Sequence, residues 1–180
     1  MPNVRVANID DAEAIAAIHI AGWRESYRGL IPQSELDGLS IPDRAAKWRQ
    51  AIHEMQNKAG QSIFVAEKQG EIGGFVNGGK CRSDLLGREM EVYAIYLLQR
   101  IKRVGIGTAL LNALFSDFIS QAACSAGVWV LRDNYPARSF YEKRGARYAT
   151  DRVEQRPGYA LIEIGYGWGD IRSMAPTGLP

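Results

Sequence analysis

The chain has 180 residues, of which 46% are hydrophobic and 23% are charged, and its net charge is +2 at neutral pH. This length fits one domain with a full hydrophobic core, and the composition is that of an ordinary soluble globular protein. The small net charge gives no support to nucleic-acid binding, and no apolar run approaches the roughly 18 residues that cross a membrane.

Cysteine and histidine are too few and too scattered to indicate a metal centre. Cys81 and Cys124 lack metal-ligand spacing and fit a reducing compartment better than a disulfide framework. His19 and His53 fall in helical patterns, where packing or a solvated face explains them, so a zinc site or a Ser-His-Asp triad is poorly supported. The first residues lack the apolar segment of a signal peptide. We therefore expect a cytoplasmic protein without a metal.

The first half of the chain alternates between strand and helix patterns. A weak alternation predicts a strand over 4–7, and Asp10 or Asp11 can cap a helix that ends near Tyr27. Pro42 suits the first turn of a second helix, which ends over 57–60. Two hairpin strands are predicted over 62–68 and 71–76, the second interrupted by Gly73-Gly74, and a polar connection follows over 77–87.

The second half begins with the most apolar strand, over 89–98, whose residues are apolar on both faces and predict a central strand covered on both sides. The pattern then predicts a helix over 108–123, a strand over 127–131, a short helix over 136–144 ended by Gly145, and strands over 147–151 and 159–168. Residues 171–180 are expected to form a flexible tail. This order predicts a mixed α/β sheet of about seven strands with helices on both faces.

The segment from Lys102 to Thr108 separates the central strand from the following helix. Gly105 and Gly107 allow close approach to the backbone, and the free N–H groups at the positive end of a helix suit a phosphate or pyrophosphate. The glycines alone equally fit an ordinary helix start. Because position 110 is Leu110 and Gly107 is followed directly by Thr108, neither a Rossmann loop nor a P-loop is present.

Two segments in the expected order resemble the GCN5-related N-acetyltransferase (GNAT) superfamily. The loop has Lys102, Gly105 and Gly107 where the family has Gln or Arg and two glycines, with Arg103 in place of a frequent extra glycine. The segment Asn134–Ala146, with the sequence NYPARSFYEKRGA, is similar to the family signature Asn-x-x-Ala-x-x-Phe-Tyr-Glu-Lys-x-Gly-Phe. The resemblance implies a single N-acetyltransferase domain over 1–170, a mostly antiparallel sheet and acetyl-CoA as the acetyl donor.

The same resemblance assigns the cofactor contacts. It places the pyrophosphate of acetyl-CoA on the loop, which consists of Lys102, Arg103, Val104, Gly105, Ile106, Gly107 and Thr108. It places the pantetheine arm along the backbone of Ile95, Tyr96 and Leu97, with the Leu97 N–H as a donor to the thioester oxygen. Asn134, at the start of the second segment, either binds the pantetheine arm or caps the turn.

The catalytic residues that the resemblance implies are Tyr141 and Glu91. A phenol with a pKa near ~10 can protonate a departing thiolate whose pKa is near ~8.5, although Tyr141 could also be only a packed aromatic beside Phe140. Glu91 stands eleven residues before Lys102 and could deprotonate the acceptor amine; alternatively it is a solvated strand-end charge and water is the base. Tyr27 and Tyr93 are candidates for acceptor contacts.

The function expected from these residues is acetyl-CoA-dependent N-acetylation of a primary amine in a small molecule or a protein. Transfer would be direct, because neither cysteine lies near either motif. The alternative is a non-catalytic acyl-CoA-binding or sensor module on the same fold, which a comparison of binding and turnover in Tyr141→Phe would distinguish. The resemblance also leaves a homodimer open.

Overall fold

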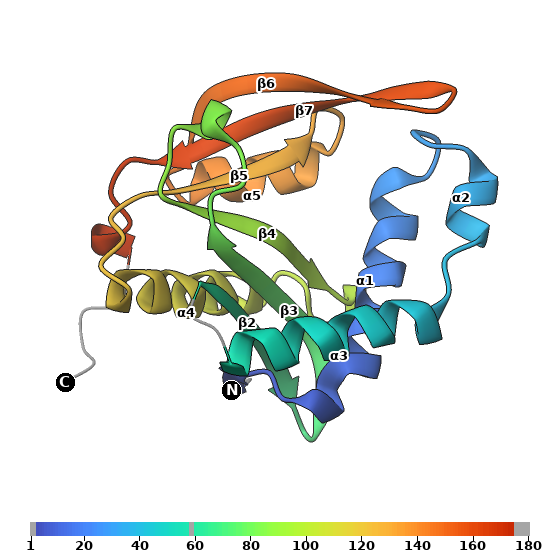
Figure 1. Cartoon of the computed structure of the whole chain (residues 1–180), viewed down its shortest axis with the longest axis horizontal. Coiled ribbons are helices and arrows are strands. Elements are labelled where there is room, and N and C mark those ends of the chain that lie inside the picture. Colours follow the sequence, from blue (N-terminus) through green and yellow to red (C-terminus); the bar gives the residue numbers. More distant parts are fainter. Residues whose placement is uncertain (1–2, 58–59, 175–180) are drawn as a thin grey trace. The chain divides into compact units, whose positions relative to one another are not determined.

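The structure is a computed structural model that describes residues 3–57 and 60–174. Its strands are β1 (Asn3–Val6), β2 (Gln61–Lys68), β3 (Glu71–Lys80), β4 (Met90–Leu97), β5 (Ala126–Leu131), β6 (Arg147–Arg156) and β7 (Tyr159–Trp168). Its α-helices are α1 (Ala12–Tyr27), α2 (Gln33–Asp37), α3 (Ile41–Asn57), α4 (Ile106–Ser120) and α5 (Tyr135–Lys143) (Figure 1). The strands form one seven-stranded sheet in the order β1-β2-β3-β4-β5-β7-β6.

The sheet is mixed, as the sequence predicts. β4 and β5 run parallel, whereas β1 with β2, β5 with β7, and β6 with β7 pair antiparallel. The chain divides into two compact units, one made of residues 1–77 and 94–114 and the other of 78–93 and 115–180, and each is described by itself. The assignment of 1–170 to one N-acetyltransferase domain stays a prediction.

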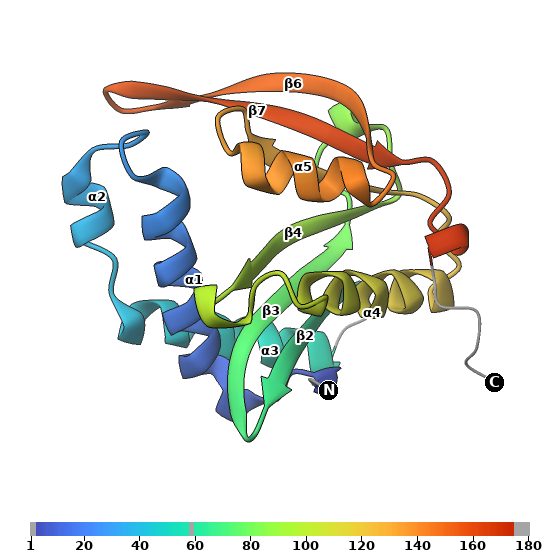
Figure 2. The same ribbon diagram turned by 180° about the vertical axis from the view of Figure 1, so that it is seen from behind.

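Helices cover both faces of β3 in the first unit. Phe75 belongs to a core cluster with α1 and α3, in which Trp48 approaches it ring to ring at 5.0 Å. Its neighbour Gly74 faces the other way, where the nearest side chains are Leu97 and Leu110 of α4. Successive residues of a strand point to opposite faces. Accordingly α3 lies in front of β2 and β3 in Figure 1 and behind them in Figure 2.

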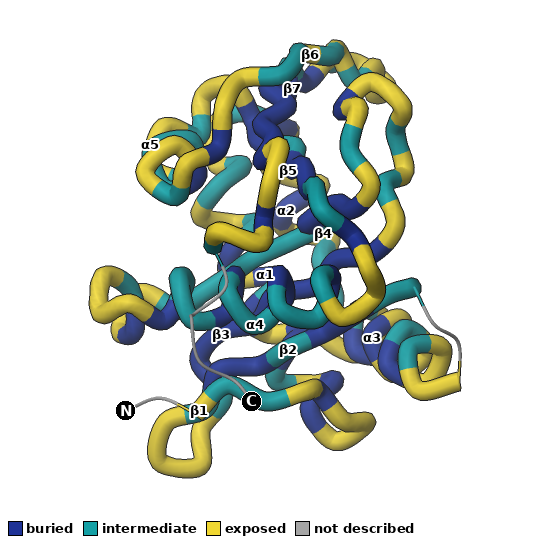
Figure 3. Tube along the Cα trace, turned by 90° about the vertical axis from the view of Figure 1, so that its left-hand side faces the viewer, coloured by how far each residue is buried: buried dark blue, intermediate teal, exposed yellow. Residues whose placement is uncertain are grey.

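The glycine pair in β3 does not interrupt the strand, so the predicted end at residue 76 is wrong. β3 continues to Lys80, and its residues 73–79 are all buried, as the dark blue trace in Figure 3 shows. A Cβ on Gly73 would lie 2.6 Å from Ile101, and one on Gly74 would lie 3.1 Å from the Tyr96 carbonyl oxygen. The glycines therefore serve close approach within a continuous strand rather than a break.

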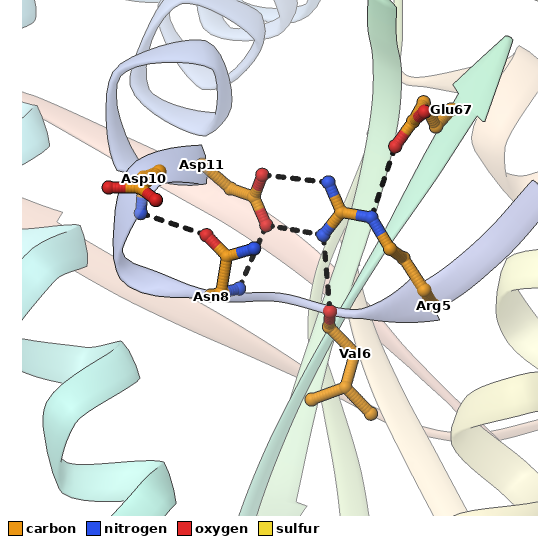
Figure 4. A network of polar contacts seen from close by, with 6 residues as sticks. All are labelled: Arg5, Val6, Asn8, Asp10, Asp11 and Glu67. Atoms are coloured by element: carbon orange, nitrogen blue, oxygen red, sulfur yellow. Dashed lines mark hydrogen bonds and ion pairs between the residues drawn. The ribbon is translucent and has the colours of Figure 1, made fainter. Parts of the chain in front are cut away.

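A buried carboxylate fixes the start of the first unit (Figure 4). Asp11 is 5% exposed and accepts two hydrogen bonds from the Arg5 guanidinium, at 2.7 and 2.9 Å, and one from the Asn8 N–H at 2.8 Å. Arg5 also donates to Glu67 of β2 at 3.1 Å. Burial alone would raise the pKa of Asp11, but the bonds from Arg5 and Asn8 outweigh it and lower that pKa. The network ties β1 to β2 and to the residue just before α1.

In the second unit, β7 pairs with β5 on one side and β6 on the other, and β6 and β7 form the long hairpin drawn in orange and red in Figure 1. β6 extends to Arg156, five residues beyond its predicted end. The helix α5, which precedes β6 in the chain, ends at Lys143. Gly145 follows it with φ +80°, which confirms the predicted end of this helix at a glycine.

Other differences from prediction concern the start of α4, the helix α2 and the start of the tail. α4 begins at Ile106 rather than Thr108, so the last residues of the predicted loop form its first turn. The short helix α2 had no sequence signal strong enough to predict it. At the start of the expected tail, Ile171 is fully buried and its N–H donates to the Cys124 carbonyl at 2.8 Å. Residues 175–180 of that tail lie outside the described residues.

Candidate active site

The loop before α4 exposes its backbone. Arg103 and Gly105 both have left-handed backbone, with φ +65° and +85°, and Arg103, Val104 and Gly105 are exposed. The Ala109 N–H closes the first turn of α4 by donating to the Gly105 carbonyl at 3.0 Å, which leaves the earlier N–H groups of the turn without helical acceptors. A Cβ on Gly105 would meet no atom within 4 Å. The loop can therefore receive an anion at the positive end of α4.

Lys102 does not present a free charge at the rim of this loop. Its ammonium group contacts both carboxylate oxygens of Glu25, at 2.8 and 2.9 Å, and the same carboxylate accepts from the Gln99 amide at 2.5 Å. Glu25 lies on the last turn of α1 and is separated from Lys102 by 77 positions. Sequence reasoning missed it because no local pattern links the two residues. The contact holds the first residue of the loop against α1.

The second half of β4 packs on an aromatic cluster. Tyr96 stacks on His19 with ring centroids 5.1 Å apart, and the absent side chain of Gly22 makes room, since a Cβ there would lie 2.1 Å from the Tyr96 ring. Burial, and secondarily the charge of Arg44, lower the pKa of His19 to about 4. His19 is therefore neutral at physiological pH. The side chain of Tyr96 thus serves packing. This agrees with the expectation that this part of β4 would contact a cofactor through its backbone and not through its side chains.

The first half of β4 carries Glu91 and Tyr93 and pairs with β5. This register covers Met90–Val92 and Ala126–Val128, although β4 continues to Leu97 and β5 to Leu131. The register therefore ends before the segment Ile95–Leu97, to which the resemblance assigns the pantetheine arm. The predicted base, Glu91, lies on the paired part of β4, one residue before the pairing ends.

The structure brings Glu91 and Tyr93 together through Arg82, which lies in the connection after β3. The Glu91 side chain is 2% exposed and accepts from the Arg82 backbone N–H at 3.0 Å, from Nε at 3.3 Å and from Nη2. The Arg82 guanidinium lies 3.9 Å from the centre of the Tyr93 ring, whose hydroxyl donates to the Lys80 carbonyl at 2.6 Å. Glu91 is thus a buried, paired carboxylate and not the solvated strand-end charge of the alternative interpretation.

Glu89, two residues before Glu91, is bonded to the residues that precede β5. Its carboxylate accepts from the Cys124 N–H at 2.7 Å and from the Ser125 N–H at 2.8 Å, and these bonds lower its pKa. Three donors in total fix it against the start of β5, because the Ser125 hydroxyl also contacts it at 3.1 Å. Hydrogen bonds to its charged form make Glu89 a poor proton acceptor.

Tyr141 is 5% exposed and lies on the buried side of α5. Its ring meets Phe140 and Trp168 edge-on, with centroids 5.3 and 6.0 Å away. Within the described residues its hydroxyl makes no hydrogen bond. Burial raises the pKa of Tyr141 well above its usual value, so the phenol keeps its proton throughout the neutral range and can act as a donor.

Asn134 and Tyr27 complete the set of predicted residues. Asn134 caps α5 by accepting from the Ala137 N–H at 3.2 Å through its side-chain oxygen, and its amide nitrogen takes no part in that bond. Tyr27 stacks on Trp23, one turn earlier in α1, with ring centroids 4.6 Å apart. The capping interpretation of Asn134 is thereby confirmed, and its cofactor contact stays a prediction.

No group of three or more His, Cys, Asp or Glu side chains with the geometry to hold a metal ion occurs within 3–57 and 60–174. In the same ranges no helix is long and apolar enough to cross a membrane.

Comparison with known proteins agrees with the fold. The model of the acetyltransferase (GNAT) family matches residues 23–146. YuaI of Bacillus subtilis (strain 168), an uncharacterized N-acetyltransferase, is 33% identical over 175 residues, covering 97% of this chain and 96% of YuaI.

Solved structures of low sequence identity share the fold. PaiA N-acetyltransferase of Thermoplasma acidophilum, in complex with coenzyme A, superimposes with a TM-score of 0.70 at 19% identity, covering 93% of this chain and 99% of PaiA. The yncA structure of Salmonella typhimurium, with its cofactor acetyl-CoA, gives 0.69 at 17% identity and covers 100% and 98%. The relatives and the fold define an acyltransferase. The chain belongs to the acetyltransferase (GNAT) family.

Proposed function

We propose that the protein transfers the acetyl group of acetyl-CoA directly to a primary amine. The observation that carries this proposal is the loop from Lys102 to Thr108, with its exposed left-handed backbone at Arg103 and Gly105 and its N–H groups at the start of α4. Coenzyme A and acetyl-CoA are present in the PaiA and yncA structures, which have the same fold. A pyrophosphate on the loop and a pantetheine arm along the backbone of Ile95 to Leu97 agree with this arrangement.

The roles of the chain's own residues follow from their chemistry. The Leu97 N–H would donate to the thioester oxygen, where negative charge develops during attack. Tyr141, which stays protonated because it is buried, would give its proton to the departing thiolate. Asn134 would hold the pantetheine arm through its amide nitrogen, and Tyr27 and Tyr93 would contact the acceptor.

Glu91 would accept the proton of the acceptor amine. Both of its oxygens already accept hydrogen bonds from Arg82, so the incoming proton must compete with one of these bonds or use a remaining lone pair. Relay through water is the competing route, and the Glu91→Gln experiment in the Discussion separates the two.

The proposal is tested by release of free thiol from acetyl-CoA in the presence of a broad panel of amines, together with calorimetric binding of coenzyme A. Binding combined with amine-dependent thiol release supports it. Coenzyme A binding without transfer to any amine would favour the sensor module, and absence of binding would remove the cofactor assignment. Light scattering tests the homodimer, and fractionation of cells tests the proposed cytoplasmic location.

A further inference from the structure

The guanidinium of Arg82 is held by contacts within the protein along one edge only. Nε and Nη2 face Glu91, and the flat face of the group lies 3.9 Å from the centre of the Tyr93 ring. Yet the Arg82 side chain remains 60% exposed, and Nη1 has no partner within the described residues. One edge of the group is thus fixed by the protein, and the other edge faces outward.

The fixing contacts are themselves held in place. The Glu91 side chain is 2% exposed, and Arg82 supplies its hydrogen bonds, so neither side chain can turn away without leaving a buried carboxylate uncompensated. The Tyr93 ring is secured at its far end by the hydroxyl bond to the Lys80 carbonyl. The long side chain of Arg82 has therefore lost most of its rotational freedom before any ligand arrives, which lowers the entropic cost of binding.

A guanidinium with an unpaired edge binds some ligands in preference to others. Its parallel N–H groups match the two oxygens of a carboxylate or of a similar oxyanion, and such charge-assisted pairs are stronger than neutral hydrogen bonds. Lys80, exposed beside this group in sequence, makes no ion pair within the described part of the chain and adds a second positive charge. The ligand class that fits is an anion.

We infer that Arg82 binds the acceptor and that the acceptor is a small amine bearing a carboxylate. This rests on the proposed function, because Glu91 and Tyr93, the two residues that Arg82 contacts, are those assigned to the acceptor side of the site. The carboxylate would pair with the outer edge of Arg82, and the amine would extend from it into the acceptor side of the site. Arg82 is in this account a substrate-binding residue, and Glu91 has the added task of orienting it.

The test compares acceptors that differ only in the carboxylate. Leucine is paired with 3-methylbutylamine, phenylalanine with phenethylamine, and lysine with 1,5-diaminopentane, and kcat/KM is measured for each at saturating acetyl-CoA. The ratio within each pair cancels changes that affect both substrates equally. We expect the wild-type ratio to favour the amino acid and Arg82→Gln to reduce it on the order of 10- to 100-fold, mainly through KM. Arg82→Lys keeps the positive charge but lacks the paired N–H groups of a guanidinium, so its kcat/KM ratio should lie between those of the wild type and Arg82→Gln.

Two controls keep the result interpretable. Arg49→Gln removes the same charge from an exposed ion pair on α3 and should leave the ratio unchanged. If Arg82→Gln unfolds because Glu91 loses its partner, the double variant Arg82→Gln with Glu91→Gln is compared with Glu91→Gln alone, again by the ratio.

The inference is overturned if the wild-type enzyme shows no preference for the carboxylate-bearing partner, or if the ratio survives the loss of Arg82. Calorimetric titration of the same amino acids into the coenzyme A complex gives a readout without turnover, and binding there must also depend on Arg82. Efficient acetylation of the decarboxylated amines would contradict this inference while supporting the proposed function. Absence of turnover with every amine, together with absence of amino-acid binding, would count against both.

Discussion

At the scale of single residues, burial sets the chemistry of Tyr141. Phe140 and Trp168 contact its ring, and burial raises the pKa of Tyr141, so the phenol keeps its proton and is uncharged at neutral pH. A protonated phenol can donate its O–H to an acceptor, such as a departing thiolate, that is present only during the reaction.

Replacement of Tyr141 by Phe removes only the hydroxyl. We expect kcat to fall by roughly 10²–10⁴-fold, the usual contribution of a general acid, with the Kd for coenzyme A nearly unchanged. Stopped-flow or steady-state thiol release measures the first quantity and calorimetry the second. Tyr148→Phe, at a tyrosine 63% exposed on β6, is the control. A loss below tenfold with a good acceptor would assign Tyr141 to packing alone.

Replacement of Glu91 by Gln keeps the shape of the side chain and removes its basicity. If Glu91 takes the amine proton, the variant should be slow near neutral pH and should approach wild-type rates only at higher pH, where the free amine is abundant. Rate against pH is therefore the measurement. Glu163→Gln provides a matched control, since Glu163 is also buried and bonded to an arginine, Arg152, at 2.7 Å. A profile identical to wild type would assign deprotonation to water.

At the scale of elements, we expect the loop before α4 to bind the cofactor through its backbone and not through its charged side chains. Gly105 has φ +85° with open space where a Cβ would be, so the obstacle to substitution is backbone conformation and not crowding within the chain. Lys102 is neutralised by Glu25. The phosphate-binding capacity of the loop is therefore expected to be more sensitive to Gly105 than to Lys102.

We expect Gly105→Val to weaken coenzyme A binding by roughly tenfold or more, because a β-branched residue at positive φ costs of order 1–3 kcal/mol and moves the N–H groups out of place. Calorimetry gives the Kd. Gly158→Val is the matched control, since Gly158 in the β6–β7 turn has the same φ of +85° and the same open space. Both should lose stability similarly, and only the first should lose affinity; equal affinities would remove the loop from the cofactor site.

The contact between His19 of α1 and Tyr96 of β4 leads us to expect that the free energy of unfolding depends on pH. His19 has a pKa near 4 in the folded chain, against about 6.5 when unfolded. As pH falls below about 6.5, the unfolded chain binds a proton that the folded chain refuses, so the free energy of unfolding decreases, by about 2 kcal/mol between pH 7 and 5. His19→Phe should abolish this part of the loss, as urea denaturation at the two pH values would show. His53→Gln, at an exposed histidine, should change nothing; a similar effect of both would refute the assignment.

At the scale of the whole molecule, the patterns that predict well are those carried by neighbouring residues. The fourth strand, the amphipathic α4 and the bounds of β7 follow from local periodicity, and the family follows from two short motifs. The prediction failed at Gly73-Gly74 because a pair of glycines reads as a break unless the bulk of Ile101 and the Tyr96 backbone opposite them is known.

Prediction of the site stopped at the same limit. Arg82 and Glu25 make the contacts that define the surroundings of Glu91 and Lys102, at separations of nine and 77 positions. No periodicity marks either one, since an exposed arginine in a loop and a glutamate on a helix are common. Only the pairing of strands and the end of α1 bring them to their partners.

The two edge strands of the sheet differ in length and in charge. An open strand edge is a template on which another chain can add, which leads to aggregation. One end of this sheet is β1, only 4 residues long, and the other is β6, whose 10 residues include Arg147, Asp151, Arg152, Glu154 and Arg156. A strand that approached β6 would have to strip water from alternating charges of both signs. The charged residues of β6 therefore disfavour the addition of another strand at this edge of the sheet.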